Sequence, residues 1–228
     1  MEKYLQEITN LTDEQLNQFK KYYEILVIES NKYNLTNLKT EEDIYIKHFL
    51  DSIIITKYID FSKITSLVDI GSGAGFPGLP LKIINPNLRI TLVEPTKKRC
   101  NFLEMVVKEL NLQDVTIIND RAENIAREYA ERFDLVTARA VAPLNILLEL
   151  TTPFSKLNGV VALLKGDLSN ELASAKNAIS KLKIKQNNIY KFDLPSNAGS
   201  RTIIEFIKTG KTPDIYPRTY AKIKKQPL

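Results

Sequence analysis

The stretch from Leu67 to Gly78, Leu-Val-Asp-Ile-Gly-Ser-Gly-Ala-Gly-Phe-Pro-Gly, constrains the fold of this chain more than any other. Its first four residues are mostly apolar and predict a short buried strand. Glycines at alternate positions then predict a tight turn whose backbone a ligand can approach closely. Pro77 is typical of a helix start. A strand, a glycine-rich turn and a helix start together predict a seat for a nucleotide-type cofactor.

From residue 66 onward, strand-like apolar runs alternate with helical patterns. We expect strands at 67–70, 89–94, 114–118, 133–137, 160–165, 189–192 and 202–208, and helices at 97–110, 144–150 and 168–182. This alternation predicts an α/β fold with a mostly parallel sheet covered on both faces. The last two strands are not separated by a long helix, so we expect a terminal hairpin with one antiparallel strand.

The first part of the chain, residues 1–62, predicts a helical extension packed on the core. Thr12 and Gln15 have the spacing of a capping box, and apolar residues recur at helical intervals after them. Residues 32–37 contain turn-forming asparagines and predict a loop. Residues 41–58 predict one or two further helices.

Composition limits the remaining possibilities. A chain of 228 residues with 43% hydrophobic content suits one α/β core, which we place at 63–210, with appended segments. Residues 211–228 are basic and interrupted by proline, and we expect an extended arm there. The absence of a membrane-spanning apolar run or a signal-peptide core predicts a cytoplasmic protein. Cys100 is the single cysteine, which argues against a disulfide framework or a cysteine-based zinc site, and we expect no metal.

Two acids help to identify the cofactor. Glu94 follows Gly71 at the distance of an acid that holds ribose hydroxyls, in NAD enzymes and S-adenosylmethionine enzymes alike. The G-x-G-x-x-G pattern beginning at Gly73 starts two residues later than in a dinucleotide fold. Asp69 would repel a pyrophosphate but suits a cofactor that carries an ammonium group, which favours S-adenosylmethionine. The alternative for Asp69 is an acid that only accepts hydrogen bonds from loop amides.

Further candidates follow the third and fourth strands. Residues 120–123 stand where an adenine edge would be read, although Glu123 could instead cap the helix that follows. Arg139 ends the fourth strand and should face the reactive methyl group, with a structural ion pair to Asp69 or Glu123 as the alternative. His48 is the only histidine and is a candidate for catalysis or RNA contact, although a lone helical histidine is more often structural.

With these motifs assembled, the chain resembles the small-subunit ribosomal RNA guanine-N7 methyltransferase family, also called glucose-inhibited division protein B. The matching motifs extend over nearly the whole chain and are Asn34-Leu35-Thr36, His48-Phe49-Leu50-Asp51-Ser52, Asp69 to Gly78, Lys98-Arg99 with Phe102-Leu103, Arg121-Ala122-Glu123, Ala138-Arg139-Ala140, Leu164-Lys165-Gly166 and Tyr216-Pro217-Arg218. The tail departs from the family pattern, because Ala221 and Ile223 stand where we expect Gly and Pro.

The resemblance implies a Rossmann-like class I S-adenosylmethionine-dependent methyltransferase fold with a seven-stranded, mostly parallel sheet. It implies a cytoplasmic enzyme that methylates N7 of one guanine of bacterial 16S ribosomal RNA, with that RNA or the small ribosomal subunit as partner. We expect a monomer. The candidate contacts to S-adenosylmethionine are Asp69, Gly71, Gly73, Phe76, Glu94, Ala122, Glu123 and Arg139.

The residues also fit the chemistry of this target. Guanine N7 carries a lone pair and no proton, so methyl transfer needs no general base, and Arg139 can act by positioning and by its field. Methylation of a pyrimidine C5 would need a nucleophilic cysteine in the cleft, and Cys100 is predicted inside a helix. Enzymes acting on exocyclic amines are expected to have an Asp/Asn-Pro-Pro-aromatic turn after the fourth strand, and residues 139–143 do not match it.

RNA affinity should come from cationic and polar side chains around the cleft. The candidates are His48, Lys97, Arg99, Lys165, Arg201 and Arg218. Two other functions are compatible with the same fold: a methyltransferase for small molecules or proteins, and a non-catalytic RNA-binding or assembly factor that retains the pocket.

Overall fold

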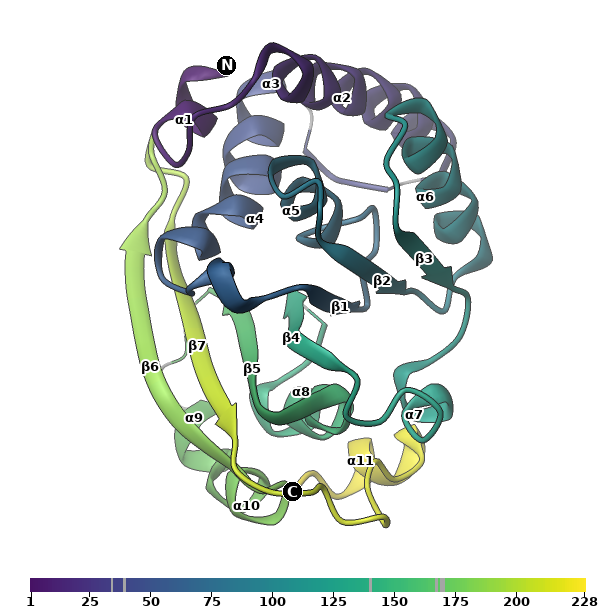
Figure 1. The fold of residues 1–228 in the computed structure, drawn as a ribbon, viewed down its shortest axis with the longest axis vertical. Coiled ribbons are helices and arrows are strands. Elements are labelled where there is room, and N and C mark those ends of the chain that lie inside the picture. The colour runs from purple at the N-terminus through teal and green to yellow at the C-terminus, as the bar shows by residue number, and fades with distance from the viewer. Residues whose placement is uncertain (34, 39, 140, 167, 169–170) are drawn as a thin grey trace.

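A seven-stranded sheet with the order β3-β2-β1-β4-β5-β7-β6 forms the centre of the molecule (Figure 1). The strands are β1 Ser66–Ile70, β2 Arg89–Val93, β3 Val115–Ile118, β4 Phe133–Arg139, β5 Ser155–Lys165, β6 Ile184–Asp193 and β7 Ser200–Lys208. The neighbours from β3 to β5 pair in parallel, and β7 is antiparallel to both β5 and β6. This confirms the predicted fold class and the terminal hairpin with one antiparallel strand.

The computed structural model describes residues 1–33, 35–38, 40–139, 141–166, 168 and 171–228. Asn34 and Ala140, which belong to two of the family motifs, lie outside these ranges. So do residues 169 and 170, which fall in the helix expected at 168–182.

Helices cover both faces of the sheet. On one side lie α2 Asp13–Tyr33, α4 Asp51–Ile53, α5 Gly78–Ile84 and α6 Lys97–Glu109, and on the other lie α7 Ala122–Ile125, α8 Leu144–Thr151, α10 Lys176–Lys181 and α11 Tyr220–Lys225 (Figure 1). The remaining short elements are α1 Lys3–Gln6, α3 Glu41–Ile44, the π-helical η1 Tyr45–Leu50, η2 Ile54–Lys57, η3 Phe61–Lys63, η4 Thr152–Phe154 and α9 Glu171–Ser174. Among the residues described, no helix is both long and apolar enough to span a bilayer.

Alternate side chains of β1 point into two hydrophobic cores, one on each face of the sheet. Leu67 packs in the core with α2, α5 and α6, whereas Val68 and Ile70 pack in the core with α8 and α11. Successive side chains of a strand point to opposite faces. Asp69 therefore shares the face of Leu67 and points toward α5, while the glycine turn continues beyond the end of the strand.

The N-terminal helices are part of the first core. The predicted capping box is confirmed: Thr12 N–H donates to Gln15 Oε1 at 3.0 Å, and Gln15 N–H donates to Thr12 Oγ1 at 3.2 Å. In the helix that follows, Phe19 and Tyr22 are buried against Phe49 of η1, with ring centroids 5.2 Å apart in both pairs. The apolar face of α2 packs on α5 and α6, so the extension joins the core through the helices that cover the sheet.

Four expectations about elements were wrong. Strand β5 begins at Ser155, five residues before the expected strand at 160. The tail is not an extended arm, because it contains α11 and buries Ile223 and Leu228 in the second core. The single helix expected at 168–182 is replaced by the short helices α9 and α10. Strand β6 begins at Ile184, five residues before the expected strand at 189, because it is an edge strand whose exposed residues give no apolar signal.

Candidate active site

A cavity of about 420 Å³ opens where β1, β2, β3 and β4 end. This is the position at which open α/β sheets bind ligands, because the strand order reverses between β1 and β4. Every predicted cofactor contact except Asp69 lines the cavity: Gly71, Gly73, Phe76, Glu94, Ala122, Glu123 and Arg139.

The glycine turn needs its glycines for different reasons. Gly71, Gly73 and Gly75 have φ values of +73°, +59° and +95°, in the region that residues with a Cβ rarely adopt. A Cβ on Gly71 would lie 2.8 Å from a methyl group of Val141, and one on Gly75 would lie 2.5 Å from the hydroxyl of Tyr22. A Cβ on Gly73 would meet only a backbone oxygen at 4.0 Å, so this glycine keeps the cavity side of the turn open.

Asp69 braces the turn from behind instead of lining the cavity. Its side chain is fully buried, and Oδ2 accepts a hydrogen bond from Gly78 N–H at 3.0 Å. Oδ1 has no hydrogen-bond partner among the described residues. Burial raises the pKa of Asp69 to about 7. Asp69 thus makes the loop-amide contact of the alternative, because the strand's alternation points this side chain toward α5. Its contact with the cofactor stays a prediction.

Glu94 is the acid that reaches the cavity. Only 2% of its side chain is exposed, and its carboxylate accepts hydrogen bonds from Gly73 N–H at 3.0 Å and Thr96 N–H at 2.8 Å. Arg99 Nη1 lies 3.8 Å from Glu94 Oε2. Because two backbone amides fix it, the carboxylate is held in place before any ligand hydroxyl reaches it.

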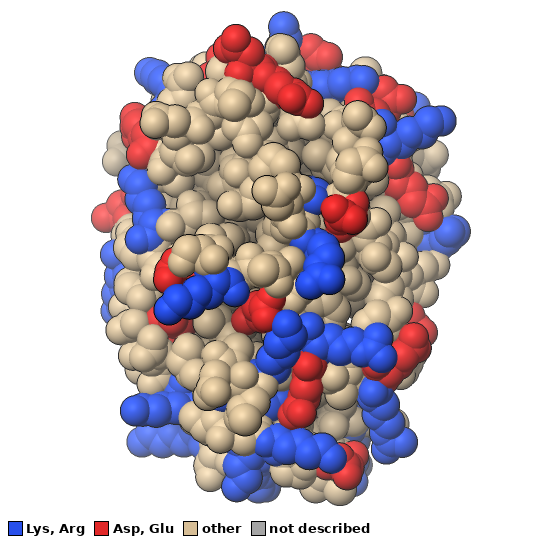
Figure 2. Space-filling view, in the orientation of Figure 1, with Lys and Arg blue, Asp and Glu red and all other residues tan. Residues whose placement is uncertain are grey.

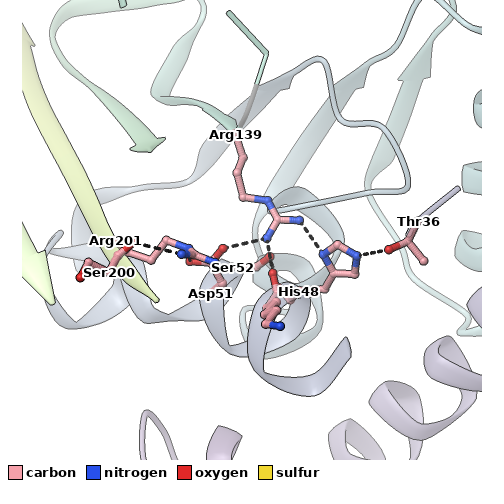
Figure 3. A network of polar contacts seen from close by, with 8 residues as sticks. Thr36, His48, Asp51, Ser52, Arg139, Ser200 and Arg201 are labelled. Carbon is pink, nitrogen blue, oxygen red and sulfur yellow. Dashed lines mark hydrogen bonds and ion pairs between the residues drawn. The ribbon is translucent and has the colours of Figure 1, made fainter. Parts of the chain in front are cut away.

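Arg139 is the centre of a polar network at the end of β4 (Figure 3). Its Nη1 donates to Lys47 O at 3.0 Å and to Asp51 Oδ2 at 3.2 Å, and its Nη2 lies 3.1 Å from His48 Nδ1. Asp51 Oδ1 also pairs with Arg201 Nε at 3.2 Å. The carboxylate that pairs with Arg139 is therefore Asp51, not Asp69 or Glu123 as the sequence suggested. Asp51, the first residue of α4, lies at the end of β4 because η1 and α4 pack there.

The same contacts define the state of His48. Guanidinium nitrogens only donate, so His48 Nδ1 accepts from Arg139 and the ring proton resides on Nε2. That nitrogen lies 2.7 Å from Thr36 Oγ1, which accepts the hydrogen bond. Burial, with the charge of Arg139, lowers the pKa of His48 to about 3, so the ring is neutral at neutral pH. The ring stacks on Phe76 with centroids 4.4 Å apart. Both ring nitrogens are thus engaged, and His48 holds Arg139 and the aromatic wall in place.

A second hollow of about 410 Å³ adjoins the cavity and shares His48 and Arg139 with it. Lys165 and Arg201 also line this hollow. Lys165 Nζ pairs with Glu171 Oε2 at 2.8 Å and donates to Ala142 O at 2.9 Å. Three of the predicted RNA contacts, His48, Lys165 and Arg201, therefore gather beside Arg139.

The other RNA candidates lie apart from this hollow. Arg99 lines the cofactor cavity, and Lys97 is exposed on α6. Arg218 Nη2 lies 2.6 Å from Oε2 of the buried Glu149, and its contact with RNA stays a prediction. On the face drawn in Figure 2, Lys and Arg gather mainly over the lower half with acids among them. This face is therefore of mixed charge and not uniformly basic.

Sequence reasoning missed three contributors to the site. The Tyr22 hydroxyl of α2 donates a hydrogen bond to Ala74 O inside the glycine turn. Thr36 Oγ1 accepts a hydrogen bond from His48 Nε2. Tyr220 lines the cofactor cavity. The helical apolar pattern signalled only that α2 is buried, and an aromatic residue in a basic tail gave no signal for the cavity.

Comparison with known proteins identifies the family. Residues 15–202 match the model of the GidB family, described as rRNA small subunit methyltransferase G. Proteins named ribosomal RNA small subunit methyltransferase G are similar over 96% of this chain: 43% identical in Carboxydothermus hydrogenoformans, covering 94% of that protein, and 45% in Staphylococcus aureus, covering 92%.

Solved structures support the fold. TYW2 of M. jannaschii in complex with AdoMet aligns with a TM-score of 0.54 at 18% identity, over 69% of this chain and 74% of that one. YcgJ of Bacillus subtilis aligns with a TM-score of 0.56 at 14% identity, over 72% of this chain and 100% of that one. With a class I S-adenosylmethionine-dependent methyltransferase fold and this degree of identity to its relatives, the chain belongs to the GidB family, the rRNA small subunit methyltransferase G enzymes.

Proposed function

We propose that this chain transfers the methyl group of S-adenosylmethionine to N7 of one specific guanine of bacterial 16S ribosomal RNA, acting as a monomer in the cytoplasm. The observation that carries the proposal is the position of Arg139, which borders both the cofactor cavity and the adjoining hollow. A base in the hollow can then approach a methyl group in the cavity beside a fixed guanidinium.

The residues of the cavity suit S-adenosylmethionine. The glycine turn leaves backbone close to the ligand, Glu94 can accept from ribose hydroxyls, and Ala122 with Glu123 lies where an adenine edge would be held. Bound S-adenosylmethionine supplies an electrophilic methyl group on sulfur. The chain's own residues orient that group and exclude water from it.

Arg139 can contact substrate without giving up its network. A guanidinium has five N–H donors, and three are committed to Lys47, Asp51 and His48. The Nε proton and one Nη2 proton remain for an oxygen of the base or of the cofactor. Both ring nitrogens of His48 are engaged, so the ring cannot act as a general base. This suits methylation of guanine N7, which releases no proton.

Cys100 supports the choice against methylation of a pyrimidine carbon. Its thiol is buried, donates to Glu94 O at 3.1 Å, and has its pKa raised by burial. A thiol in this state is a poor nucleophile.

Guanine N7 lies in the deep groove of A-form RNA, so the target base must lie in a loop or be extruded into the hollow. We expect Lys165 and Arg201, which line the hollow, to contact the RNA there, with Lys97 and Arg99 as further phosphate contacts.

The acceptor atom can be tested with modified RNA. Small subunits reconstituted with 16S RNA are incubated with labelled S-adenosylmethionine, and the label is mapped by cleavage specific for N7-methylguanine. We expect one labelled guanine, and no transfer when that residue is replaced by 7-deazaguanine, which retains the Watson–Crick edge but lacks N7. Transfer to the 7-deaza RNA contradicts the proposal and favours another acceptor atom.

Arg139 gives a second test. Arg139→Ala is expected to lower kcat about 100-fold, because a misplaced methyl donor or base costs that much. Arg139→Lys keeps the charge but loses the planar set of donors, and an intermediate rate is expected. Thermal denaturation controls for folding, since Arg201 still pairs with Asp51 in both variants. Wild-type rates in both variants contradict the assigned role.

A further inference from the structure

The C-terminal segment is attached to α8 by a buried ion pair. The side chain of Glu149 has no exposed surface. Arg218 donates its backbone N–H at 2.9 Å and its Nε–H at 2.8 Å to Oε1, and its Nη2–H at 2.6 Å to Oε2. The hydrogen bonds to Glu149 raise the pKa of Arg218. A carboxylate buried this completely requires charged partners with good geometry, so the pair fixes residue 218 relative to the sheet.

Apolar contacts hold the segment beyond that pair. Ile223 of α11 is fully buried, and Leu228 is buried at the end of the chain. Both belong to the second hydrophobic core, and Tyr216 and Tyr220 pack against it. The ion pair on one side and the apolar anchors on the other therefore define where Tyr220 lies.

Tyr220 is the residue at which this segment meets the cofactor cavity. It lines the cavity together with Ala122 and Leu150, and the guanidinium carbon of Arg121 lies 5.1 Å from the centre of its ring. Ala122 begins α7, the first helix after β3. In sheets of this type the nucleoside end of the cofactor lies near the ends of the second and third strands. Tyr220 thus stands at the nucleoside end of the cavity.

We infer that Tyr220 is a cofactor-binding residue that contacts the nucleoside half of S-adenosylmethionine, and that Arg218 is a positioning residue that holds it there through Glu149. A flat aromatic ring beside a purine offers a stacking surface. The family model ends at residue 202, so these residues lie beyond it. The inference depends on the cofactor and not on the proposed guanine acceptor.

Calorimetric titration tests the role of Tyr220. We expect Tyr220→Ala to weaken binding of S-adenosylmethionine about tenfold, the effect of losing one base–aromatic stack. Binding of S-adenosylhomocysteine should weaken by the same factor, because the two ligands differ only at the methyl group. Tyr220→Phe keeps the ring and should bind both ligands within about twofold of wild type.

Arg218→Lys tests the positioning role. This variant keeps a cation for Glu149 but loses the two-pronged hydrogen bonding. We expect a raised KM for S-adenosylmethionine with kcat at saturation unchanged, and with unchanged affinity for 16S RNA. Lys224→Ala is the control, since Lys224 is an exposed cation on α11, the helix that carries Tyr220, and it should bind the cofactor as wild type does. Thermal denaturation verifies that each variant is folded.

Two results overturn the inference: wild-type cofactor affinity in Tyr220→Ala, or a loss in that variant confined to RNA binding, as expected of an RNA-binding arm. Failure of the guanine-N7 proposal is separate, because it leaves these cofactor affinities as expected while the methyl group appears on another atom.

Discussion

Two buried carboxylates flank the glycine turn and hold it in different ways. Glu94 binds Gly73 N–H and faces the cavity, whereas Asp69 binds Gly78 N–H and faces the interior. The carboxylate of Asp69 is surrounded by protein and has one oxygen without a partner among the described residues. Removing a charge from water at such a position favours the protonated form.

Asp69 should therefore make stability depend on pH. Its folded pKa of about 7 exceeds its unfolded value of about 4, so folding takes up a proton between these pH values. His48, whose folded pKa is lowered to about 3, should contribute stability that rises with pH over much of this window. Asp69 should act in the opposite direction: its contribution to the free energy of unfolding falls as pH rises, by up to about 1.4 kcal/mol per pH unit, and levels off above the window. Asp69→Asn should lack this slope. Urea unfolding at about pH 5 and about pH 8, without added cofactor, measures both proteins, and parallel pH profiles contradict the assignment.

At the scale of elements, helix α2 supports the cofactor turn. Tyr22 lies under the turn, donates to Ala74 O and stacks on Phe76 with centroids 5.4 Å apart. A Cβ added to Gly75 would lie 2.5 Å from the hydroxyl of Tyr22 and 2.6 Å from a methyl group of Leu79. An element of the N-terminal extension thus fixes the geometry of a loop more than fifty residues away in sequence.

Two glycines of this turn should differ in their response to substitution by alanine. Gly75→Ala should cost both the positive φ, about 1–2 kcal/mol, and the steric conflict, about 1–3 kcal/mol more. Gly73→Ala has room within the protein and should cost only the first amount, but its methyl group enters the cavity and should weaken S-adenosylmethionine binding. Urea unfolding and calorimetry measure the two effects. An equal loss of stability in both variants contradicts this division of roles.

For the whole molecule, the N-terminal helices and the sheet share one core and one polar network. Phe19 and Phe49 belong to the same hydrophobic cluster as Leu79 and Leu103. Asp51 additionally joins Arg139 of β4 and Arg201 of β7. We therefore propose that residues 1–62, 63–210 and 211–228 are segments of one cooperative unit.

Urea unfolding should show a single transition, with far-ultraviolet circular dichroism and tyrosine fluorescence changing together. A fragment of residues 63–228 should not fold cooperatively, because it exposes the face of α5 and α6 that packs on α2. Two separated transitions, or a fragment with native circular dichroism, contradict a single unit.

The sequence by itself determined the features that depend on local backbone and periodicity. The glycine turn could be predicted because glycine readily adopts the positive φ angles that the turn requires. The sheet could be predicted from alternating apolar runs, and the capping box from the spacing of Thr12 and Gln15. Glu94 was found because its distance from the turn is set by one strand–helix–strand unit.

Only the tertiary structure decided which partners the charged residues take. Arg139 pairs with Asp51, Arg218 with Glu149, and Asp69 turns away from the cavity toward α5. A sequence states which charges exist, but their pairing depends on which distant elements exclude water together. For the same reason the basic tail, which reads locally as a solvated arm, is docked by one buried carboxylate and a few apolar side chains of the second core.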